Sequence, residues 1–270
     1  MPAVAVLHPG EMGAAVGAAL VDVAVDVVWL PPRRSIDTGR RAAVAGMRAV
    51  DDLVGCDLVV SVCPPGAALQ VASNVASQGF SGIYLDANAI SPATAAEVAA
   101  LVTAGGAAYV DGGIIGPPPH AAGSTRLYLS GDRAGVVSEV ALAFHESRLE
   151  PVVVDAGPFA ASATKMTYAA WTKVSAALLL ATRDAARALD VEDVLHAEWQ
   201  ASQPELAARL GGAETSAQAK GWRWEAEMRE IARTFAGVGL SPGFGEAAAA
   251  VFSGYERPGV GPDGEPGSAS

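Results

Sequence analysis

Near the start of the chain stands the stretch Val4-Ala5-Val6-Leu7-His8-Pro9-Gly10-Glu11-Met12-Gly13. Its apolar run predicts a buried strand, and the proline-free, Ala-rich segment after Gly10 predicts a helix. Gly10 and Gly13 are spaced as the last two glycines of a G-x-G-x-x-G turn, which holds the pyrophosphate of a dinucleotide at a helix N-terminus. We therefore predict a dinucleotide-binding turn formed by Pro9, Gly10, Glu11, Met12 and Gly13.

The first glycine of that motif is missing, because His8 stands in its place and is followed by Pro9. A residue before proline prefers an extended backbone, so we expect His8 to be extended and the turn to begin differently from the usual one. An incomplete glycine motif also fits an ordinary strand–loop–helix corner that binds nothing.

A second strand is predicted over residues 23–30, and it ends at Pro31-Pro32-Arg33-Arg34-Ser35. This loop follows the glycine turn by roughly 20 residues, where βαβ nucleotide folds contact the adenosine ribose. No acidic residue is present to bind a free 2′-hydroxyl, whereas guanidinium groups bind phosphate well. Arg33, Arg34 and Ser35 therefore predict NADP as the cofactor; the alternative is a solvated basic turn.

Composition excludes several classes of protein. The 270 residues carry a formal net charge of −11, without the basic stripe that nucleic-acid binding requires. Only Cys56 and Cys63 are present, and no Cys-x-x-Cys or His-x-x-x-His pair predicts a bound metal. The first strand begins within a few residues and charge or glycine interrupts the apolar runs, so we expect no signal segment, no membrane contact and a cytoplasmic protein.

Further short apolar runs alternate with helical patterns up to residue 155, at 56–63, 82–86, 107–110, 126–131 and 151–154. This alternation predicts an α/β, Rossmann-like domain over residues 1–155, with a mostly parallel sheet covered by helices on both faces. Loops after the strands should converge at the carboxyl edge of the sheet, at Gly10, Arg33, Pro64, Asn88 and Gly113. Cys63, Pro64, Pro65 and Asn88 thereby join the predicted cofactor site, and Asn88 and Gly113 the substrate site.

After residue 155 the pattern is helical. Residues 159–189 contain neither glycine nor proline and predict one long helix, and 191–203, 204–210, 214–238 and 244–255 predict further helices. We assign residues 156–255 to an all-α domain for substrate binding and dimerisation, because its apolar faces suit pairing into a homodimer. Residues 256–270, rich in Pro and Gly, predict a disordered tail.

The strongest candidate for acid–base chemistry is Lys165, near the start of the long helix. Lys165, Tyr168 and Thr172 stand at i, i+3 and i+7, so they share one face of a regular helix and could contact a small-molecule substrate. A lysine partly desolvated in a cleft has a lowered pKa and can exchange a proton with a carbonyl or hydroxyl oxygen. The alternative is a surface lysine on an amphipathic helix.

The order of four motifs resembles the β-hydroxyacid dehydrogenase and 6-phosphogluconate dehydrogenase superfamily. These motifs are Gly10-Glu11-Met12-Gly13, Asp86-Ala87-Asn88-Ala89-Ile90-Ser91-Pro92, Asp111-Gly112-Gly113 and Lys165. Residues 111–119, 125–131 and 220–228 are similar to a bacterial subgroup that has a short helical C-terminal domain of unknown function. The resemblance implies an NAD(P)-dependent oxidoreductase with Lys165 as catalytic lysine and Arg34-Ser35 at the 2′-phosphate of NADP.

Three polar substrate contacts of that superfamily are replaced by Ala89, Ile115 and Ala169. These replacements favour a less polar carbonyl compound or an imine over a simple 3-hydroxy acid. An imine reductase of the same fold is one alternative, although the retained Lys165 counts against it. A dinucleotide-binding regulatory protein without turnover is another.

Overall fold

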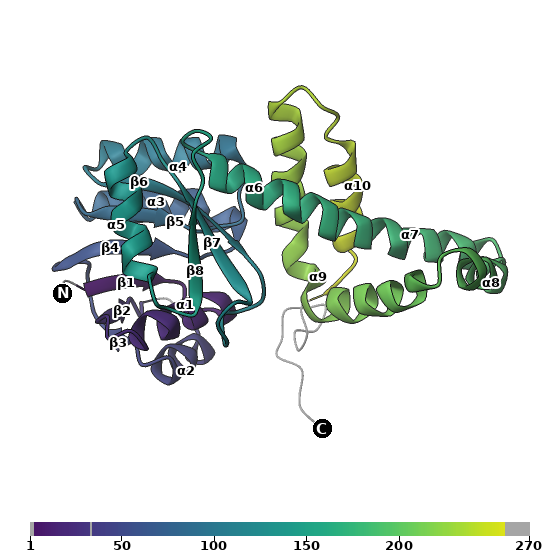
Figure 1. The fold of residues 1–270 in the computed structure, drawn as a ribbon, viewed down its shortest axis with the longest axis horizontal. Helices are drawn as coiled ribbons and strands as arrows, with labels where there is room; N and C mark the ends of the chain where they lie inside the picture. Colours follow the sequence, from purple (N-terminus) through teal and green to yellow (C-terminus); the bar gives the residue numbers. More distant parts are fainter. Residues whose placement is uncertain (1–2, 33, 257–270) are drawn as a thin grey trace. The chain divides into compact units, whose positions relative to one another are not determined.

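The computed structural model describes residues 3–32 and 34–256, which fall into two compact units, residues 1–166 and 167–270 (Figure 1). This division comes later than residue 155, because the helix that begins at Ala160 forms hydrogen bonds with the sheet in its first turn. All but Glu256 of the predicted tail lies outside the described residues.

The first unit is built on an eight-stranded sheet of order β3-β2-β1-β4-β5-β6-β7-β8. Neighbouring strands are parallel except β6 and β7, which are antiparallel. The strands are β1 (Ala3–Leu7), β2 (Val27–Trp29), β3 (Arg48–Ala49), β4 (Cys56–Ser61), β5 (Ile83–Asp86), β6 (Ala108–Ile115), β7 (Thr125–Ser130) and β8 (Leu149–Val153). The order reverses between β1 and β4, which is the topological switch point where such sheets bind ligands.

Helices cover both faces of this sheet, as the sequence predicts. They are α1 (Glu11–Val21), α2 (Ile36–Val44), α3 (Ala68–Ser77), α4 (Pro92–Ala104) and α5 (Ala134–Phe144). Alternation along the strands creates two apolar cores. Val4 and Val6 of β1 pack with α1, α2 and α5, whereas Ala5 and Leu7 pack with α3 and α4. The Rossmann-like prediction is thus confirmed.

Several element boundaries in this unit differ from the sequence prediction. The second strand begins at Val27 rather than at residue 23, because the chain turns at Ala24 with φ +61°. Arg48 lies in a further short strand, β3, which the sequence pattern does not predict, since α2 ends at Val44. Strand β6 continues past residue 110 to Ile115 because its antiparallel pairing with β7 persists, so Gly113 lies within a strand rather than in a loop.

The second unit is helical. Helix α6 (Ala160–Ala169) begins in the first unit and continues into a π-helical turn, η2 (Ala170–Val174), followed by α7 (Ser175–Ala188), α8 (Glu192–Ser202), α9 (Glu205–Gly237) and α10 (Gly243–Phe252). The two helices predicted over 204–210 and 214–238 are one, because Gly211 and Gly212 are accommodated inside α9. No helix in the described part of the chain is long and apolar enough to cross a membrane.

Candidate functional site

The glycine turn joins β1 to α1. The carbonyl oxygen of His8 accepts a hydrogen bond from the Gly10 N–H at 2.6 Å. A β-carbon on Gly13 would lie 2.5 Å from that same oxygen, so only glycine permits this close approach of helix and turn. The φ angle of His8 is +60°, and the expectation of an extended residue before Pro9 is therefore wrong. His8 adopts the left-handed backbone for which glycine is favoured.

No side-chain oxygen caps the N-terminus of α1, because the N-cap residue is Gly10. The N-terminal amides and the positive end of the helix dipole therefore point at the switch point, as an anion site requires. The segment Cys63-Pro64-Pro65 follows β4 at the other side of this switch point. Burial and then Asp86 raise the pKa of the Cys63 thiol to about 12, so Cys63 remains a neutral thiol.

Four polar side chains form a row at the carboxyl edge of the sheet. Ser61, Asp86, Asp111 and Ser130 are paired in register on β4, β5, β6 and β7, and all four are buried. A row of this kind follows from strand register and is not visible in any local motif. We call these four residues the polar row.

The two carboxyl groups of the polar row have raised pKa values. Burial, followed by the neighbouring Asp111, raises the pKa of Asp86 to about 7. Burial also raises the pKa of Asp111 to about 6, although hydrogen bonds from Ser162 and Ser130 oppose this shift. Within the described residues, Asp86 Oδ2 and the hydroxyl groups of Tyr84 and Tyr109 are buried without a hydrogen-bond partner. Asp86 is the less stabilised of the two carboxylates.

Asn88 supports this row instead of facing outward. Its side-chain oxygen accepts a hydrogen bond from the Cys63 N–H at 2.6 Å, and its Nδ2 donates to Asp86 Oδ1 at 2.6 Å and to Ser61 Oγ at 3.0 Å. Asn88 is buried. The side chain thus fixes the loop after β4, and a direct contact of Asn88 with cofactor or substrate stays a prediction.

Asp111 also fixes the start of α6. Its Oδ2 accepts a hydrogen bond from the Ser162 N–H at 2.8 Å, and its Oδ1 accepts one from the Ser162 hydroxyl at 2.5 Å. The Ser130 hydroxyl oxygen accepts from the Ala161 N–H at 2.9 Å and donates to Asp111 Oδ2 at 3.0 Å. No local sequence motif predicts these functions of Asp111, Ser130 and Ser162.

Gly113 brings Lys165 against the sheet. A β-carbon on Gly113 would lie 2.6 Å from the Ala161 carbonyl oxygen and 3.0 Å from the Cβ of Lys165. Strand β6 and helix α6 therefore touch backbone to backbone at this point. Lys165 is half-buried. It lies against β6 at Gly113, two residues beyond Asp111 of the polar row and at the same sheet edge as the glycine turn.

The predicted ribose loop is described from Arg34 on, because Arg33 lies outside the described residues. Ser35 is the N-cap of α2: its Oγ accepts a hydrogen bond from the Thr38 N–H at 3.2 Å. Arg34 Nη2 donates to His8 Nδ1 at 3.3 Å, while Arg34 Nε is buried and has no partner in the described chain.

Arg41 also reaches the glycine turn, where its Nε donates to the Pro9 carbonyl oxygen at 3.4 Å. Arg41 is not among the residues predicted for the cofactor site. Its place in the second turn of the helix that follows the predicted ribose loop was the available signal.

Tyr168 and Thr172 belong to the second unit, whereas Lys165 belongs to the first. Thr172 lies in the π-helical turn, so the i, i+7 rule of a regular α-helix does not fix its direction. Its hydroxyl donates to the Tyr168 carbonyl oxygen at 3.2 Å. A shared substrate face for Lys165, Tyr168 and Thr172 stays a prediction.

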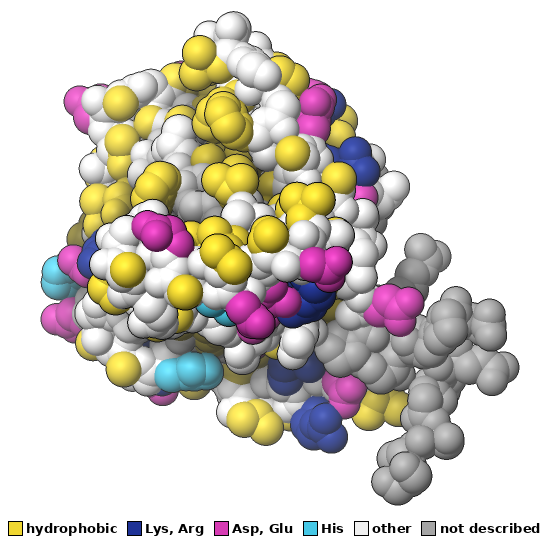
Figure 2. Space-filling model, turned by 90° about the vertical axis from the view of Figure 1, so that its right-hand side faces the viewer, with side chains coloured by type: hydrophobic (Ala, Val, Ile, Leu, Met, Phe, Trp, Pro, Cys, Tyr) yellow, Lys and Arg dark blue, Asp and Glu magenta, His cyan; other side chains and the backbone are white. Residues whose placement is uncertain are grey.

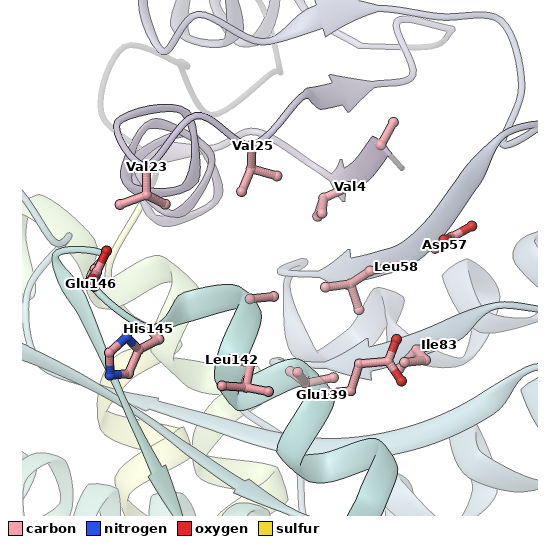
Figure 3. A pocket seen from close by; sticks show the side chains of 13 residues that line it. Val4, Val23, Val25, Asp57, Leu58, Ile83, Glu139, Leu142, His145 and Glu146 are labelled. Atoms are coloured by element: carbon pink, nitrogen blue, oxygen red, sulfur yellow. The ribbon is translucent and has the colours of Figure 1, made fainter. Parts of the chain in front are cut away.

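The structure shows a cavity of about 560 Å³ elsewhere in the first unit (Figure 3). It is lined mainly by apolar residues, among them Val4, Leu58 and Ile83 near the amino ends of β1, β4 and β5. It therefore lies at the sheet edge opposite the glycine turn. In residues 3–32 and 34–256, no group of His, Cys, Asp or Glu is placed to hold a metal ion.

Comparisons with known proteins agree with this architecture. Residues 186–254 match the family model described as a domain of unknown function, DUF1932. No curated protein matches the sequence. The chain is 26% identical to the conserved protein MTH1747 of unknown function, whose structure is described as similar to 3-hydroxyacid dehydrogenases; the match covers 93% of this chain and 95% of that one, with a TM-score of 0.67.

Two further solved structures share the fold at lower identity. The 3-hydroxyisobutyrate dehydrogenase of Mycobacterium tuberculosis is 17% identical over 94% of this chain and 93% of its own, with a TM-score of 0.70. An imine reductase of Streptomyces aurantiacus is 18% identical over 93% of each chain, with a TM-score of 0.53. The chain therefore shares the fold of structures similar to 3-hydroxyacid dehydrogenases, and residues 186–254 of its helical C-terminal part match DUF1932.

Proposed function

We propose that the protein is an NADP-dependent oxidoreductase that transfers a hydride between nicotinamide and a small hydroxy or carbonyl compound, with Lys165 as the acid–base group. One observation carries this proposal. Asp111 and Gly113 hold the first turns of α6 so that Lys165 lies at the carboxyl edge of the sheet, where the glycine turn also ends. In this proposal the helical unit forms the homodimer and supplies Tyr168 and Thr172 to the substrate, in the cytoplasm.

The residues present fit a dinucleotide. Gly13 leaves room for a closely packed turn, and the uncapped α1 N-terminus provides amide donors for a pyrophosphate. Arg34 Nε is a buried donor without an acceptor in the described chain, which a phosphate oxygen would supply. The cap at Ser35 starts α2 beside this arginine. Of these features, the buried Arg34 donor is the one that favours NADP over NAD, because the pyrophosphate is common to both cofactors.

A nicotinamide cofactor held at this edge would supply or accept the hydride. Lys165 is then the proton donor to the carbonyl oxygen in reduction, or the acceptor from the hydroxyl in oxidation. Ile115 and Ala169 are both buried and apolar. Because superfamily members carry polar substrate contacts at these positions, the substrate here has less polar surface than a 3-hydroxy acid.

An imine is the second candidate substrate, favoured by the same two apolar residues. The two candidates differ in the atom that receives the proton, oxygen or nitrogen. The test measures NADPH oxidation with a panel of aldehydes, ketones and cyclic imines, and NADP⁺ reduction with hydroxy acids. Turnover with a carbonyl or hydroxy compound supports the first candidate. Tight NADPH binding without turnover of any panel member would contradict both and indicate a dinucleotide-binding regulatory protein.

A further inference from the structure

His8 occupies a position where the dinucleotide turn ordinarily has glycine, and its side chain extends to the loop after β2. The imidazole Nδ1 lies 3.3 Å from Nη2 of Arg34, although 26 positions separate the two residues. We propose that His8 determines cofactor choice by holding the Arg34 guanidinium where it binds the 2′-phosphate of NADP. This inference rests on the proposed function, because it assumes that Arg34 binds this phosphate.

The chemistry of the contact defines the state of the imidazole. A guanidinium has donors only, so His8 Nδ1 must accept the hydrogen bond and the ring proton must lie on Nε2. Burial, followed by the charge of Arg34, lowers the pKa of His8 to about 4. The ring is therefore neutral at pH 7 and able to accept from Arg34.

The backbone conformation of His8 argues against the explanation that this residue serves only to shape the turn. With φ at +60°, a residue with a β-carbon is strained, whereas glycine would adopt this conformation without cost. The carbonyl contacts of the turn, to the Gly10 N–H and beside Gly13, use only backbone atoms of His8 and would survive a change to glycine. What glycine cannot supply is the imidazole that contacts Arg34.

Within the residues that the structure describes, the surroundings of Arg34 leave its guanidinium with few contacts to orient it other than the hydrogen bond to His8. Burial lowers its pKa, and its Nε has no partner in the described part of the chain. The bond to His8 fixes the outer end of the guanidinium, so that the plane of the group is set before any phosphate arrives. Fixing a side chain in advance reduces the entropy lost on binding, which raises the affinity for the ligand that uses it.

The experiment compares the wild type with His8→Gly and His8→Asn. His8→Gly relieves the backbone strain at φ +60° and removes the Nδ1 acceptor of Arg34. Asparagine tolerates the left-handed backbone and places Oδ1 near the position of the imidazole Nδ1, so it keeps an acceptor for Arg34. Calorimetric titrations with NADP⁺ and with NAD⁺ at pH 7.5 give the ratio of the two dissociation constants for each protein, and a thermal melt checks that each variant is folded.

We expect His8→Gly to melt no lower than the wild type, to bind NADP⁺ about tenfold more weakly and to bind NAD⁺ within twofold of the wild type. His8→Asn should keep the wild-type ratio within about threefold. A His8→Gly variant that retains the full preference for NADP⁺, or a His8→Asn variant that loses it, overturns the inference and leaves the proposed function intact. A wild type without preference for NADP⁺ overturns both.

A second measurement tests the contact without cofactor. The sequence contains four histidines, so the imidazole nitrogen signals can be assigned by substitution in ¹⁵N NMR. We expect His8 to be the neutral Nε2–H tautomer in the wild type and its Nδ1 signal to shift in Arg34→Ala. An Nδ1–H tautomer, or an Nδ1 signal unchanged by Arg34→Ala, contradicts the inference whatever the cofactor preference is.

Discussion

The carboxylate of Asp111 accepts hydrogen bonds from both the N–H and the hydroxyl of Ser162, at 2.8 and 2.5 Å, and so joins the edge of the sheet to the start of α6. Lys165 follows Ser162 within the same turn of this helix. The geometry of the proposed acid–base group therefore depends on a carboxylate that never needs to touch the substrate. Asp111 is a positioning residue in this scheme.

Asp111→Asn should weaken this junction. An amide replaces one of the two acceptor oxygens with a donor, so at least one of the bonds from Ser162 and Ser130 is lost. Hydrogen bonds to charged groups contribute about 1.5–3 kcal/mol. Removal of a buried carboxylate whose pKa is raised to about 6 offsets part of this loss, so we expect a smaller net decrease in the free energy of unfolding, measured by urea denaturation. Turnover should fall while the affinity for NADP⁺ stays nearly constant. Ser162→Ala, which keeps the N–H contact, is the milder control, and equal stability of Asp111→Asn and wild type would contradict the argument.

Asp86→Asn should raise the free energy of unfolding, in contrast to Asp111→Asn. Its native pKa of about 7 exceeds the ordinary value of 3.8, so the native state binds a proton more tightly than the unfolded chain. The resulting stabilisation is complete below about pH 3.8 and is lost as the pH rises through 7. Asp86→Asn removes this loss, and at roughly 1.4 kcal/mol per pKa unit the variant should be about 2–4 kcal/mol more stable than the wild type at pH 8.

The measurement for Asp86→Asn is urea unfolding at pH 5 and pH 8, with amide hydrogen exchange in β5 to assign the transition to the first unit. The difference between variant and wild type should be about half as large at pH 5 as at pH 8, because the loss begins above pH 3.8 and is complete only above pH 7. A variant that is less stable than the wild type at pH 8 would show that the ionised carboxylate is well accommodated in the polar row.

Much of the fold follows from local pattern. The apolar run before Gly10 forms β1, and its alternation fills two cores because successive side chains point to opposite faces. The position of Gly13 likewise predicts the close approach that the structure shows beside the His8 carbonyl. These features depend on residues that are neighbours in sequence, so the sequence alone suffices to predict them.

The remaining features depend on tertiary structure. The polar row arises from the register of four strands, and no local motif shows that Asp86 pairs with Asp111. The π-helical turn at Ala170–Val174 interrupts a segment that contains no glycine or proline, so helix propensity does not predict it. The left-handed backbone of His8 opposes the preference that Pro9 imposes, because the turn and the Arg34 contact outweigh it.

The homodimer predicted from the sequence can be tested on the second unit. Leu178 of α7 and Val194 of α8 are 67% and 70% exposed, and Figure 2 shows hydrophobic side chains over the face that the helices of this unit present. We expect light scattering to return twice the mass of one chain and Leu178→Glu to shift the mass toward one chain. Val44→Glu, at an 86% exposed position in α2, is the matched control and should leave the mass unchanged. A wild-type mass of one chain across micromolar concentrations would contradict the prediction.

Arg34 should contribute mainly to NADP⁺ affinity, and Ser35 mainly to the stability of the fold. Arg34→Ala removes a charge-assisted phosphate contact of about 1.5–3 kcal/mol, so NADP⁺ should bind at least tenfold more weakly and NAD⁺ should bind unchanged. Ser35→Ala removes the α2 cap at Thr38 and should cost about 1 kcal/mol of stability, with a smaller effect on NADP⁺. Arg40, which is exposed and paired with Asp37, provides the control substitution to Ala. Equal effects of Arg34→Ala and Arg40→Ala on NADP⁺ would exclude a specific phosphate contact.

The choice of control decides how Lys165 can be tested. Lys173 is unsuitable, because it forms an ion pair with the buried Glu227 and lies 5.2 Å from the centre of the Trp224 ring. Its replacement leaves a buried carboxylate without this partner and should destabilise the second unit. Lys220 of α9 is the better lysine control. Lys165→Arg keeps the charge but not the compact ammonium group that delivers a proton to one atom.

With a substrate identified from the panel, Lys165→Met should lower turnover by about 10²–10⁴-fold, the usual contribution of a general acid–base group, while the NADP⁺ dissociation constant changes little. Lys165→Arg should recover only part of the activity, because a guanidinium holds its proton too tightly to exchange it at neutral pH. Lys220→Met should retain near-normal turnover. The turnover of the wild type should also depend on pH through one group that Lys165→Met removes from the profile. A near-normal rate in Lys165→Met would show that the lysine at this sheet edge takes no part in proton transfer.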